Sequence, residues 1–412
     1  MRTKIDIFRA AALFAILAMF YGRARADLLD DVNRALSIRD EKHQFQLQLT
    51  GLIDFEGYFI DQRPPGLIDS DDSFLFNPRV RLFVDAQLGR HFYFFTQVRL
   101  DRGFDPSDRG ADLRLDEYFL RYAPFDNPRV GIQVGKFATV VGSWVLRHDS
   151  WQNPFVNAPL PYENITTLSD WEAPSSRQDF AGRRFQTTEQ YERIPLIWGP
   201  NYTAGAAILG TIDHFDYAFE IKNAAISSRP DSWQPTEMDW SNPHFAGRIG
   251  FRPNESWNFG ASGSVGPYMT DQALHMHTLP AGKNIDNYNQ YLLGQDVSFA
   301  WRHFQLWAEV FEARFEVPTV GDADTLSYYL EARYKITPQL FAATRWNQQL
   351  YATVPAGGSQ QPWGNDTWRV DSAVGYRLTN FLQLKIQYSF THQDAPLQQG
   401  EQLVAGQVTI KF

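Results

Sequence analysis

The sequence predicts an all-β fold, a transmembrane antiparallel β-barrel of about sixteen strands. Three observations support this fold class: long segments in which apolar and polar residues alternate, connections that are alternately short and long, and an N-terminal segment typical of exported proteins. A strand with this alternation presents one face to lipid and the other to water. A chain built from such strands can therefore span a membrane without any long apolar run.

Alternation is clearest in the first predicted strand, residues 45–59. Its odd positions, from Phe45 to Phe59, are apolar or glycine, whereas most of its even positions are polar. Successive side chains of a strand point to opposite faces, so this segment has one apolar and one polar face. The same pattern predicts sixteen strands: residues 45–59, 76–89, 91–101, 113–123, 128–137, 202–210, 214–223, 244–252, 256–265, 291–301, 303–315, 326–335, 339–349, 366–378, 381–392 and 401–412.

The connections between these strands alternate in length. The short ones are Arg90, residues 124–127, 211–213, 253–255, Arg302, 336–338 and 379–380. The long ones are residues 60–75, 102–112, 138–201, 224–243, 266–290, 316–325, 350–365 and 393–400. Outer-membrane barrels have short turns at one end, long loops at the other and an even number of strands. The spacing therefore favours a closed barrel over a soluble sandwich.

The first 26 residues have the three parts of a secretory signal peptide. A positively charged start precedes residues 10–21, which carry no charge, and small residues follow at Ala24 and Ala26. This apolar run is too short for a spanning helix, which needs about 20 residues. We expect cleavage after Ala26, which divides the chain into a signal peptide (1–26), a periplasmic N-terminal segment (27–44) and the barrel domain (45–412).

The N-terminal segment 27–44 has apolar residues at helical spacing, Leu29, Val32 and Leu36, which indicate a short helix.

Composition narrows the class of protein further. Cysteine is absent, which excludes a disulfide scaffold, a thiolate metal site and a cysteine nucleophile. The mean hydropathy of −0.39 fits alternating strands, in which polar and apolar residues average out.

Five short segments carry a resemblance to a known family. They are Gly51–Gly57 (GLIDFEG), Phe76–Leu82 (FNPRVRL), Val134–Phe137 (VGKF), Phe219–Asn223 (FEIKN) and Gly247–Pro253 (GRIGFRP). With them the chain resembles the phosphate- and polyphosphate-selective porins over most of its mature length. The resemblance implies a sixteen-stranded homotrimeric barrel in the outer membrane of a Gram-negative-type bacterium, with the long third loop folded into the lumen. It also implies a water-filled channel for passive diffusion of small hydrophilic solutes and ions.

The chain ends in Gly406–Phe412, and its terminal Phe412 resembles the insertion signal that the barrel-assembly machinery reads. The expected partners are that machinery, outer-membrane lipids, small ions and solutes, and two further copies of the chain. No nucleic acid, cofactor or metal is expected.

The polar faces of the predicted strands supply candidate channel-lining residues. Rings of arginine attract anions, and the guanidinium fork suits phosphate oxygens. The candidates are Arg79, Arg81, Arg99, Arg121, Arg248, Arg252, Arg345, Arg369, Asp85, Glu117, Glu220, Asp296 and Glu309. The candidates in the third loop, the expected constriction, are Arg147, Arg177, Arg183, Arg184 and Arg193.

Acidic residues balance these bases, both in the third loop and on the strands. The resembled family uses a basic ladder and a basic constriction, so the balance counts against phosphate selectivity here. We expect the charges to pair across the wall and to line a general diffusion channel.

Two other classes of protein compete with a channel. An outer-membrane barrel enzyme needs a nucleophile, a base and an orienting residue within hydrogen-bond reach, and no Ser/His/acid spacing stands out. A secreted all-β binding protein is expected to have shorter strands. Neither alternative explains the alternating connections, and we expect no enzymatic activity.

Overall fold

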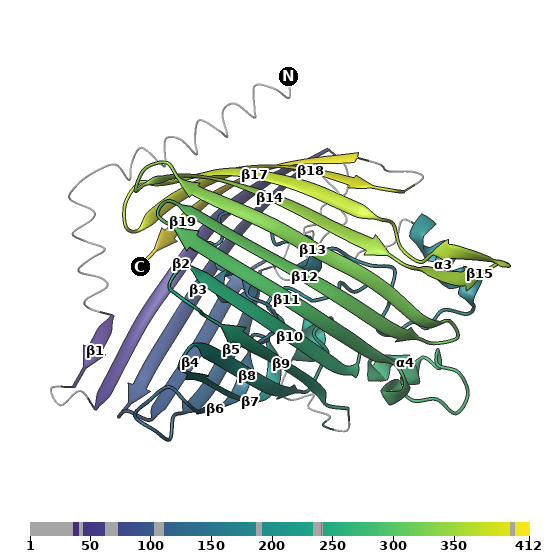
Figure 1. Cartoon of the computed structure of the whole chain (residues 1–412), viewed down its shortest axis with the longest axis horizontal. Coiled ribbons are helices and arrows are strands. Elements are labelled where there is room, and N and C mark those ends of the chain that lie inside the picture. The colour runs from purple at the N-terminus through teal and green to yellow at the C-terminus, as the bar shows by residue number, and fades with distance from the viewer. Residues whose placement is uncertain are drawn as a thin grey trace.

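The computed structural model describes residues 36–40, 44–61, 73–102, 111–186, 192–233, 240, 242–395 and 400–412. Within these residues sixteen long strands form one antiparallel barrel (Figure 1). The barrel strands are β2 (Phe45–Ile60), β3 (Phe74–Leu88), β4 (Phe92–Asp101), β5 (Asp112–Tyr122), β6 (Gly131–Phe137), β7 (Thr203–Ile212), β8 (Phe215–Lys222), β9 (His244–Phe251), β10 (Trp257–Pro267), β11 (Asn289–Trp301), β12 (Phe304–Val317), β13 (Gly321–Lys335), β14 (Leu340–Tyr351), β17 (Thr367–Arg377), β18 (Leu382–Gln393) and β19 (Gly400–Lys411).

The barrel closes between its last and first strands, because residues 403–411 of β19 lie opposite residues 52–60 of β2. Every neighbouring pair is antiparallel, which confirms the predicted fold class. One end of the barrel carries the short connections and is called the turn end; the other is called the loop end. None of the described helices is long and apolar enough to cross a membrane.

The prediction of a long loop at 316–325 was wrong. β12 continues to Val317 and β13 starts at Gly321, so that only a tight turn joins them. Polar residues near this turn bind each other across the two strands: Arg314 donates to Asp324 at 2.7 Å and lies 3.1 Å from Asp322. Both side chains of the Arg314–Asp324 pair are exposed, so the pairing fits strand geometry but adds little stability.

The predicted helix in residues 27–44 was not found where this segment is described. Ser37–Arg39 form a short strand, β1, which pairs with residues 46–48 of β2. β19 pairs with residues 52–60 of β2 and therefore leaves residues 46–48 without a partner on that side. β1 pairs with residues 46–48 and covers this free edge. The signal peptide and residues 27–35 lie outside the described residues.

The remaining short elements lie in the connections. They are η1 (Trp144–Arg147), η2 (Leu160–Tyr162), α3 (Arg177–Gly182), η3 (Arg183–Phe185), η5 (Pro230–Trp233), α4 (Asp271–His275), η7 (Ile285–Asn287), β15 (Thr353–Ala356) and β16 (Ser359–Pro362).

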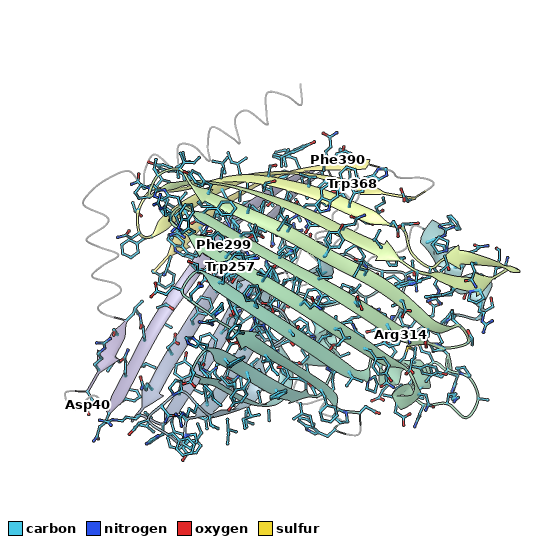
Figure 2. The ribbon with its side chains drawn as sticks, viewed as in Figure 1. Asp40, Trp257, Phe299, Arg314, Trp368 and Phe390 are labelled. Carbon is cyan, nitrogen blue, oxygen red and sulfur yellow. The ribbon has the colours of Figure 1, made fainter. Side chains whose placement is uncertain are left out.

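The outer surface of the barrel is apolar and rich in aromatic rings. Trp257 and Phe299 lie side by side, with ring centroids 4.5 Å apart, and Trp368 lies 5.5 Å from Phe390 (Figure 2). Exposed aromatic and aliphatic side chains of this kind continue around the wall. Such rings are favoured at membrane interfaces, so the outer face fits a lipid environment.

The closing seam brings the terminal residue against a glycine. The backbone N–H of Phe412 donates to the carbonyl of Gly51 at 3.1 Å, and the N–H of Gly51 donates back at 2.9 Å. A Cβ atom at Gly51 would lie 2.3 Å from Cζ of the Phe412 ring. The aromatic ring therefore covers the glycine, as aromatic side chains do where a glycine leaves a strand bare.

We expect Gly51→Val to displace the Phe412 ring and to reduce the yield of closed barrel. Overpacking of this kind costs about 1 kcal/mol or more. The folded fraction is measured by heat-modifiable gel migration after refolding into detergent. Gly406→Val is the matched control, because Gly406 lies on the neighbouring strand and a Cβ atom there would have no neighbour within 4 Å. Equal yields for the two variants would contradict the role of the ring.

The core of the molecule lies inside the barrel. The third loop is called L3 (residues 138–202). Its described parts, residues 138–186 and 192–202, fold into the lumen and contact strands on several sides of the wall. Its buried side chains include Val141, Trp144 and Tyr162, which join Phe311 and Tyr329 of the wall in one cluster. The loop is therefore a packed part of the lumen.

Candidate functional site: the lumen and its third loop

Three inward-facing carboxylates, each on a different strand, hold the first residues of L3. Glu117 of β5 accepts a hydrogen bond from the backbone N–H of Ala138 at 3.2 Å. Glu220 of β8 accepts from the N–H of Val140 at 3.3 Å and from the Thr139 hydroxyl at 2.8 Å. These side chains were predicted to line the channel; they face the lumen, but they are engaged by the loop.

The third carboxylate is Glu309 of β12, which is completely buried. It accepts from the backbone N–H of Ser143, from the Ser143 hydroxyl at 2.9 Å, from the N–H of Trp144 at 3.1 Å and from the Tyr162 hydroxyl at 2.7 Å. An ionised carboxylate is an acceptor with about four lone-pair sites, and here four donors reach it. Glu309 therefore joins two separate parts of L3 to the wall.

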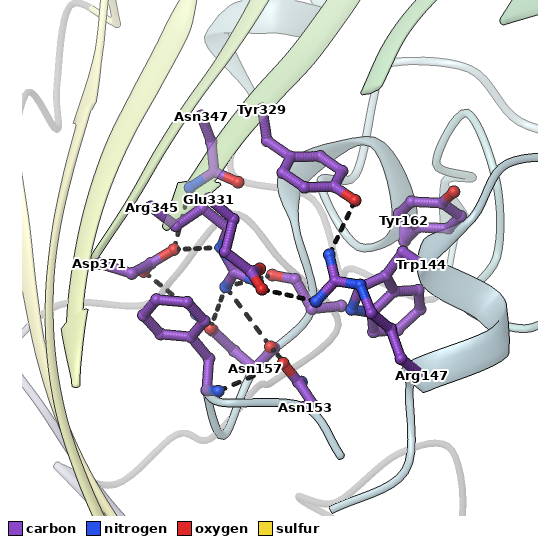
Figure 3. Close-up of polar contacts among 12 residues, drawn as sticks. Trp144, Arg147, Asn153, Asn157, Tyr162, Tyr329, Glu331, Arg345, Asn347 and Asp371 are labelled. Carbon is purple, nitrogen blue, oxygen red and sulfur yellow. Dashed lines mark hydrogen bonds and ion pairs between the residues drawn. The ribbon is translucent and has the colours of Figure 1, made fainter. Parts of the chain in front are cut away.

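A buried network centred on Arg345 holds the middle of L3 (Figure 3). The Nε of Arg345 donates to Asp371 at 2.9 Å, and its Nη2 donates to the Asn157 side chain of L3 at 2.6 Å. Glu331 lies 3.5 Å from Arg345 and also accepts from Arg147 of L3 at 2.5 Å. Arg147 is thus the one constriction-loop candidate that these contacts bring to the β13 wall.

Arg369 extends this network along β17. It lies 3.0 Å from Asp371 and pairs with Glu163 of L3. Arg345 and Arg369 were predicted to line the channel and do face inward, but both are buried against L3.

Two lysines that the sequence analysis did not single out also hold the loop. The ammonium group of Lys385 donates to the carbonyls of Ser150 at 2.8 Å, Asn153 at 2.9 Å and Phe155 at 3.1 Å. Lys222 donates to the carbonyls of Phe137 and Thr203, the strand residues that flank L3 on either side. Both lysines lie on the polar face of their strands, and this is the sequence feature that could have identified them as lumen residues.

Arginines and acids alternate on the wall formed by β2 to β5. Arg79 lies 3.2 Å from Asp54 and also pairs with Glu56. Arg81 lies 3.6 Å from Asp54 and donates to the Ser150 hydroxyl of L3 at 2.9 Å.

The pairing continues on β4 and β5. Arg99 lies 2.5 Å from Asp101 and 3.8 Å from Asp116, and Arg114 lies 2.9 Å from Asp101. The arginines expected to attract anions are therefore neutralised on this wall.

The remaining strand candidates follow the same rule. Arg248 pairs with Asp296 at 2.7 Å and with Asp216 at 2.9 Å, and Asp85 accepts from the Tyr93 hydroxyl. Arg252 is not on the wall: β9 ends at Phe251, and Arg252 lies in the following turn with a 63% exposed side chain. Pro253, which lacks an N–H, follows it and cannot continue the ladder.

Arg121 differs from these arginines. Its Nε and Nη2 donate to the side-chain oxygen of Gln133, at 3.0 and 2.7 Å, and it forms no ion pair with a described carboxylate. Arg333, which was not among the candidates, likewise donates from Nε and Nη2 to Gln305. Arg377, also not a candidate, donates from Nε to Gln383 at 2.9 Å and from Nη2 to the carbonyl of Trp151 in L3 at 3.3 Å.

The four other arginines predicted at the constriction lie in the later part of L3. Arg183 and Arg193 are buried beside Glu172, at 3.9 and 3.5 Å. Arg177 is exposed at the start of α3, and the carbonyl of Arg184 accepts from Asn365 of the β14–β17 connection. This part of L3 lies against the connection at the loop end.

His148 fixes the segment of L3 next to the arginine wall. Its Nδ1 lies 2.6 Å from the carbonyl of Val145 and its Nε2 lies 2.7 Å from the Tyr202 hydroxyl. Burial, together with Arg81, lowers the pKa of His148 to about 4. The neutral ring can donate from Nδ1 and accept at Nε2, and this arrangement is retained until the pH falls toward 4.

In the described part of the chain, no three His, Asp or Glu side chains are grouped so that they could hold a metal ion. The site is therefore best described as a polar lumen partly filled by a tethered loop.

Comparison with solved structures finds the same barrel fold in outer-membrane proteins. No protein-family model and no curated protein matches the sequence. An anion-selective porin from Comamonas acidovorans matches with a TM-score of 0.56 at 10% identity, over 89% of this chain and 100% of that one. The outer membrane channel DcaP of Acinetobacter baumannii matches with a TM-score of 0.56 at 11% identity, over 91% and 99%.

A trimer form of OmpT, an outer membrane protein of Vibrio cholerae, matches with a TM-score of 0.54 at 10% identity, over 89% of this chain and 99% of that one. Nearly the full length of each solved chain is covered. The chain therefore has the closed antiparallel barrel fold of these outer-membrane proteins.

Proposed function

We propose that the chain is an outer-membrane porin that forms a water-filled channel for the passive diffusion of small hydrophilic solutes and ions. The observation that carries this proposal is the opposite character of the two faces of one closed barrel. The outer face exposes aromatic and aliphatic side chains, and the inner face carries charged and amide side chains around a loop fixed in the lumen. A barrel of sixteen strands is wide enough for an aqueous channel.

The proposed channel is a general one. Phosphate selectivity, which the resembled family shows, needs a continuous ladder of guanidinium groups with spare charge along the permeation path. Arg79, Arg81 and Arg99 are instead paired with carboxylates. We therefore expect phosphate to block this channel weakly.

The proposed setting is the outer membrane, as a homotrimer, after removal of the signal peptide. The similar Vibrio cholerae protein is described as an outer membrane protein in a trimer form, and the apolar outer wall suits both lipid and a neighbouring copy. Insertion through the barrel-assembly machinery is part of the same proposal and rests on the terminal Phe412.

Planar-bilayer recording of the detergent-folded protein tests this function. We expect stepwise insertion of stable open channels, with a small reversal potential in a KCl gradient and little block by added phosphate. Strong phosphate block would restore the family's specificity to this chain. No channels from protein shown to be folded by heat-modifiable migration would overturn the porin proposal.

A further inference from the structure

At the turn end of the lumen, three arginines share an arrangement that the paired arginines lack. Each faces a glutamine across the strand ladder: Arg121 opposite Gln133, Arg333 opposite Gln305, and Arg377 opposite Gln383. An amide oxygen orients a guanidinium group without cancelling its charge. These three groups form no ion pair with the described carboxylates, so each keeps its net positive charge.

Each of these guanidinium groups also lies over aromatic rings. Arg121 lies 5.3 Å from the centroid of Phe119 and 5.8 Å from that of Tyr93. Arg333 lies 5.6 Å from Trp307, and Arg377 lies 5.1 Å from Trp151 of L3. A ring under one face of the guanidinium does not occupy its edge, so the Nη1 N–H groups, which donate to neither the glutamine nor L3, can reach an anion.

The aromatic rings beside Arg121 are part of a larger aromatic surface on the inner wall. Phe95 lies 5.5 Å from Phe119, and Phe83 lies 6.2 Å from Phe95 in a stacked arrangement. Register places all three on the inner face, since Phe83 lies opposite Gln97 and Phe95 lies opposite Phe119. Phe83 and Phe95 are only half-buried, so part of each ring faces the lumen. We call Phe83, Tyr93, Phe95 and Phe119 the aromatic wall.

The acids of this region are engaged by other groups. Asp85 accepts from the Tyr93 hydroxyl, and Glu117 accepts from the N–H of Ala138 in L3. A half-exposed aromatic surface is unfavourable in a channel that passes only water and inorganic ions, because apolar area in contact with water costs free energy. A solute with an apolar ring would cover this surface while its charge met Arg121.

We propose that Arg121 and the aromatic wall form a binding site for aromatic carboxylates in the turn-end half of the channel. The carboxylate receives hydrogen bonds from Arg121, and the ring of the solute stacks on Phe95 and Phe83. This inference rests on the proposed function, since it names the class of solute that the channel favours. Arg333 and Arg377 supply the same combination of charge and ring on the opposite strands.

The test compares three anions as blockers of the chloride current in planar bilayers: benzoate, acetate and inorganic phosphate. Benzoate and acetate share the carboxylate, so their difference reports the contribution of the ring. We expect benzoate to block at a concentration about fivefold lower than acetate, and phosphate to block no better than acetate; a fivefold change corresponds to about 1 kcal/mol.

Two variants separate the components of the site. The double variant Phe83→Leu, Phe95→Leu keeps apolar side chains but removes the aromatic faces, and we expect it to abolish the difference between benzoate and acetate. Arg121→Gln should weaken block by both carboxylates. Arg314→Gln is the control, because Arg314 is exposed on the outer surface near the loop end (Figure 2), and it should behave as the wild type does.

The outcomes distinguish the two proposals. Channels that open normally but are blocked equally by benzoate and acetate would overturn the aromatic-carboxylate site and leave the porin function intact. Benzoate block that persists unchanged in both the Phe83/Phe95 and the Arg121 variants would overturn the site as well. Folded protein that forms no channels would overturn the porin function itself.

Discussion

Replacement of Glu309 by alanine is expected to release the start of L3 and to widen the channel. The substitution removes the acceptor for Ser143, Trp144 and Tyr162 in a buried setting. A buried donor that loses its partner costs about 1–3 kcal/mol, so the loss of several destabilises the seated loop strongly. We expect a several-fold rise in single-channel conductance, with larger current fluctuations, because L3 no longer stays packed against β12.

Glu312→Ala is the matched control for this experiment. Glu312 lies on the same strand, but its side chain is exposed on the opposite face, so the variant loses the same charge without touching L3. We expect its conductance to equal that of the wild type. Unchanged conductance in the Glu309 variant, with the barrel folded, would show that L3 is held without this carboxylate.

The strands could be predicted from the sequence because the pattern has a period of two. Arg79 and Arg81 were assigned to the lumen by alternation alone, and the register places them there. Alternation did not predict the β12–β13 hairpin. At its loop end the usual alternation is inverted, because Phe315 and Val317 are buried on the inner face whereas Arg314 and Asp324 are exposed on the outer face. No property of Arg314 alone shows that Asp324 will stand opposite it.

The sequence of one strand does not show whether a neighbouring carboxylate neutralises the charge of its arginine. Arg79 lies opposite Asp54 and is neutralised, whereas Arg121 lies opposite Gln133 and is not. The partner is set by cross-strand register, and a shift of two residues would exchange one for another. The neutral and the charged arginines are therefore indistinguishable until the strands are paired.

The contacts of L3 were beyond sequence reasoning for a related reason. Glu309 binds Ser143, a residue far away along the chain, and Lys385 binds carbonyls of Ser150 and Phe155. The loop has no periodic pattern that would indicate which wall it meets. An inward-facing carboxylate on a strand can contact either water in the lumen or a residue of L3, and alternation does not distinguish the two.

The lumen thus has two regions with different electrostatic character. Toward the loop end, charges are balanced by ion pairs and used to hold L3; toward the turn end, Arg121, Arg333 and Arg377 are oriented by glutamines and keep their charge. Among the described arginines of the barrel strands, those without an ion pair lie in the second region. Selectivity, where the channel has it, is expected to arise there.

The second large effect is expected from Arg345→Ala, which removes the centre of the buried network. Arg345 has no exposed surface and joins Asp371, Glu331 and Asn157 of L3. Breaking a buried ion pair by removing one partner costs about 3–5 kcal/mol. Because Arg369 still pairs with Asp371 and Arg147 with Glu331, we expect a loss toward the lower end of this range.

The measurement is the midpoint of thermal unfolding in detergent, followed by the β-sheet circular dichroism signal. Arg345→Lys restores the charge but not the guanidinium fork, which here reaches three partners at once, so it should recover only part of the loss. Arg314→Ala, on the exposed outer surface, should leave the midpoint almost unchanged. If Arg345→Ala unfolds at the wild-type temperature, the buried network contributes specificity of loop placement rather than stability. A single-channel recording of the same variant distinguishes loop placement from stability, since a barrel of normal stability with a misplaced L3 still shows altered conductance.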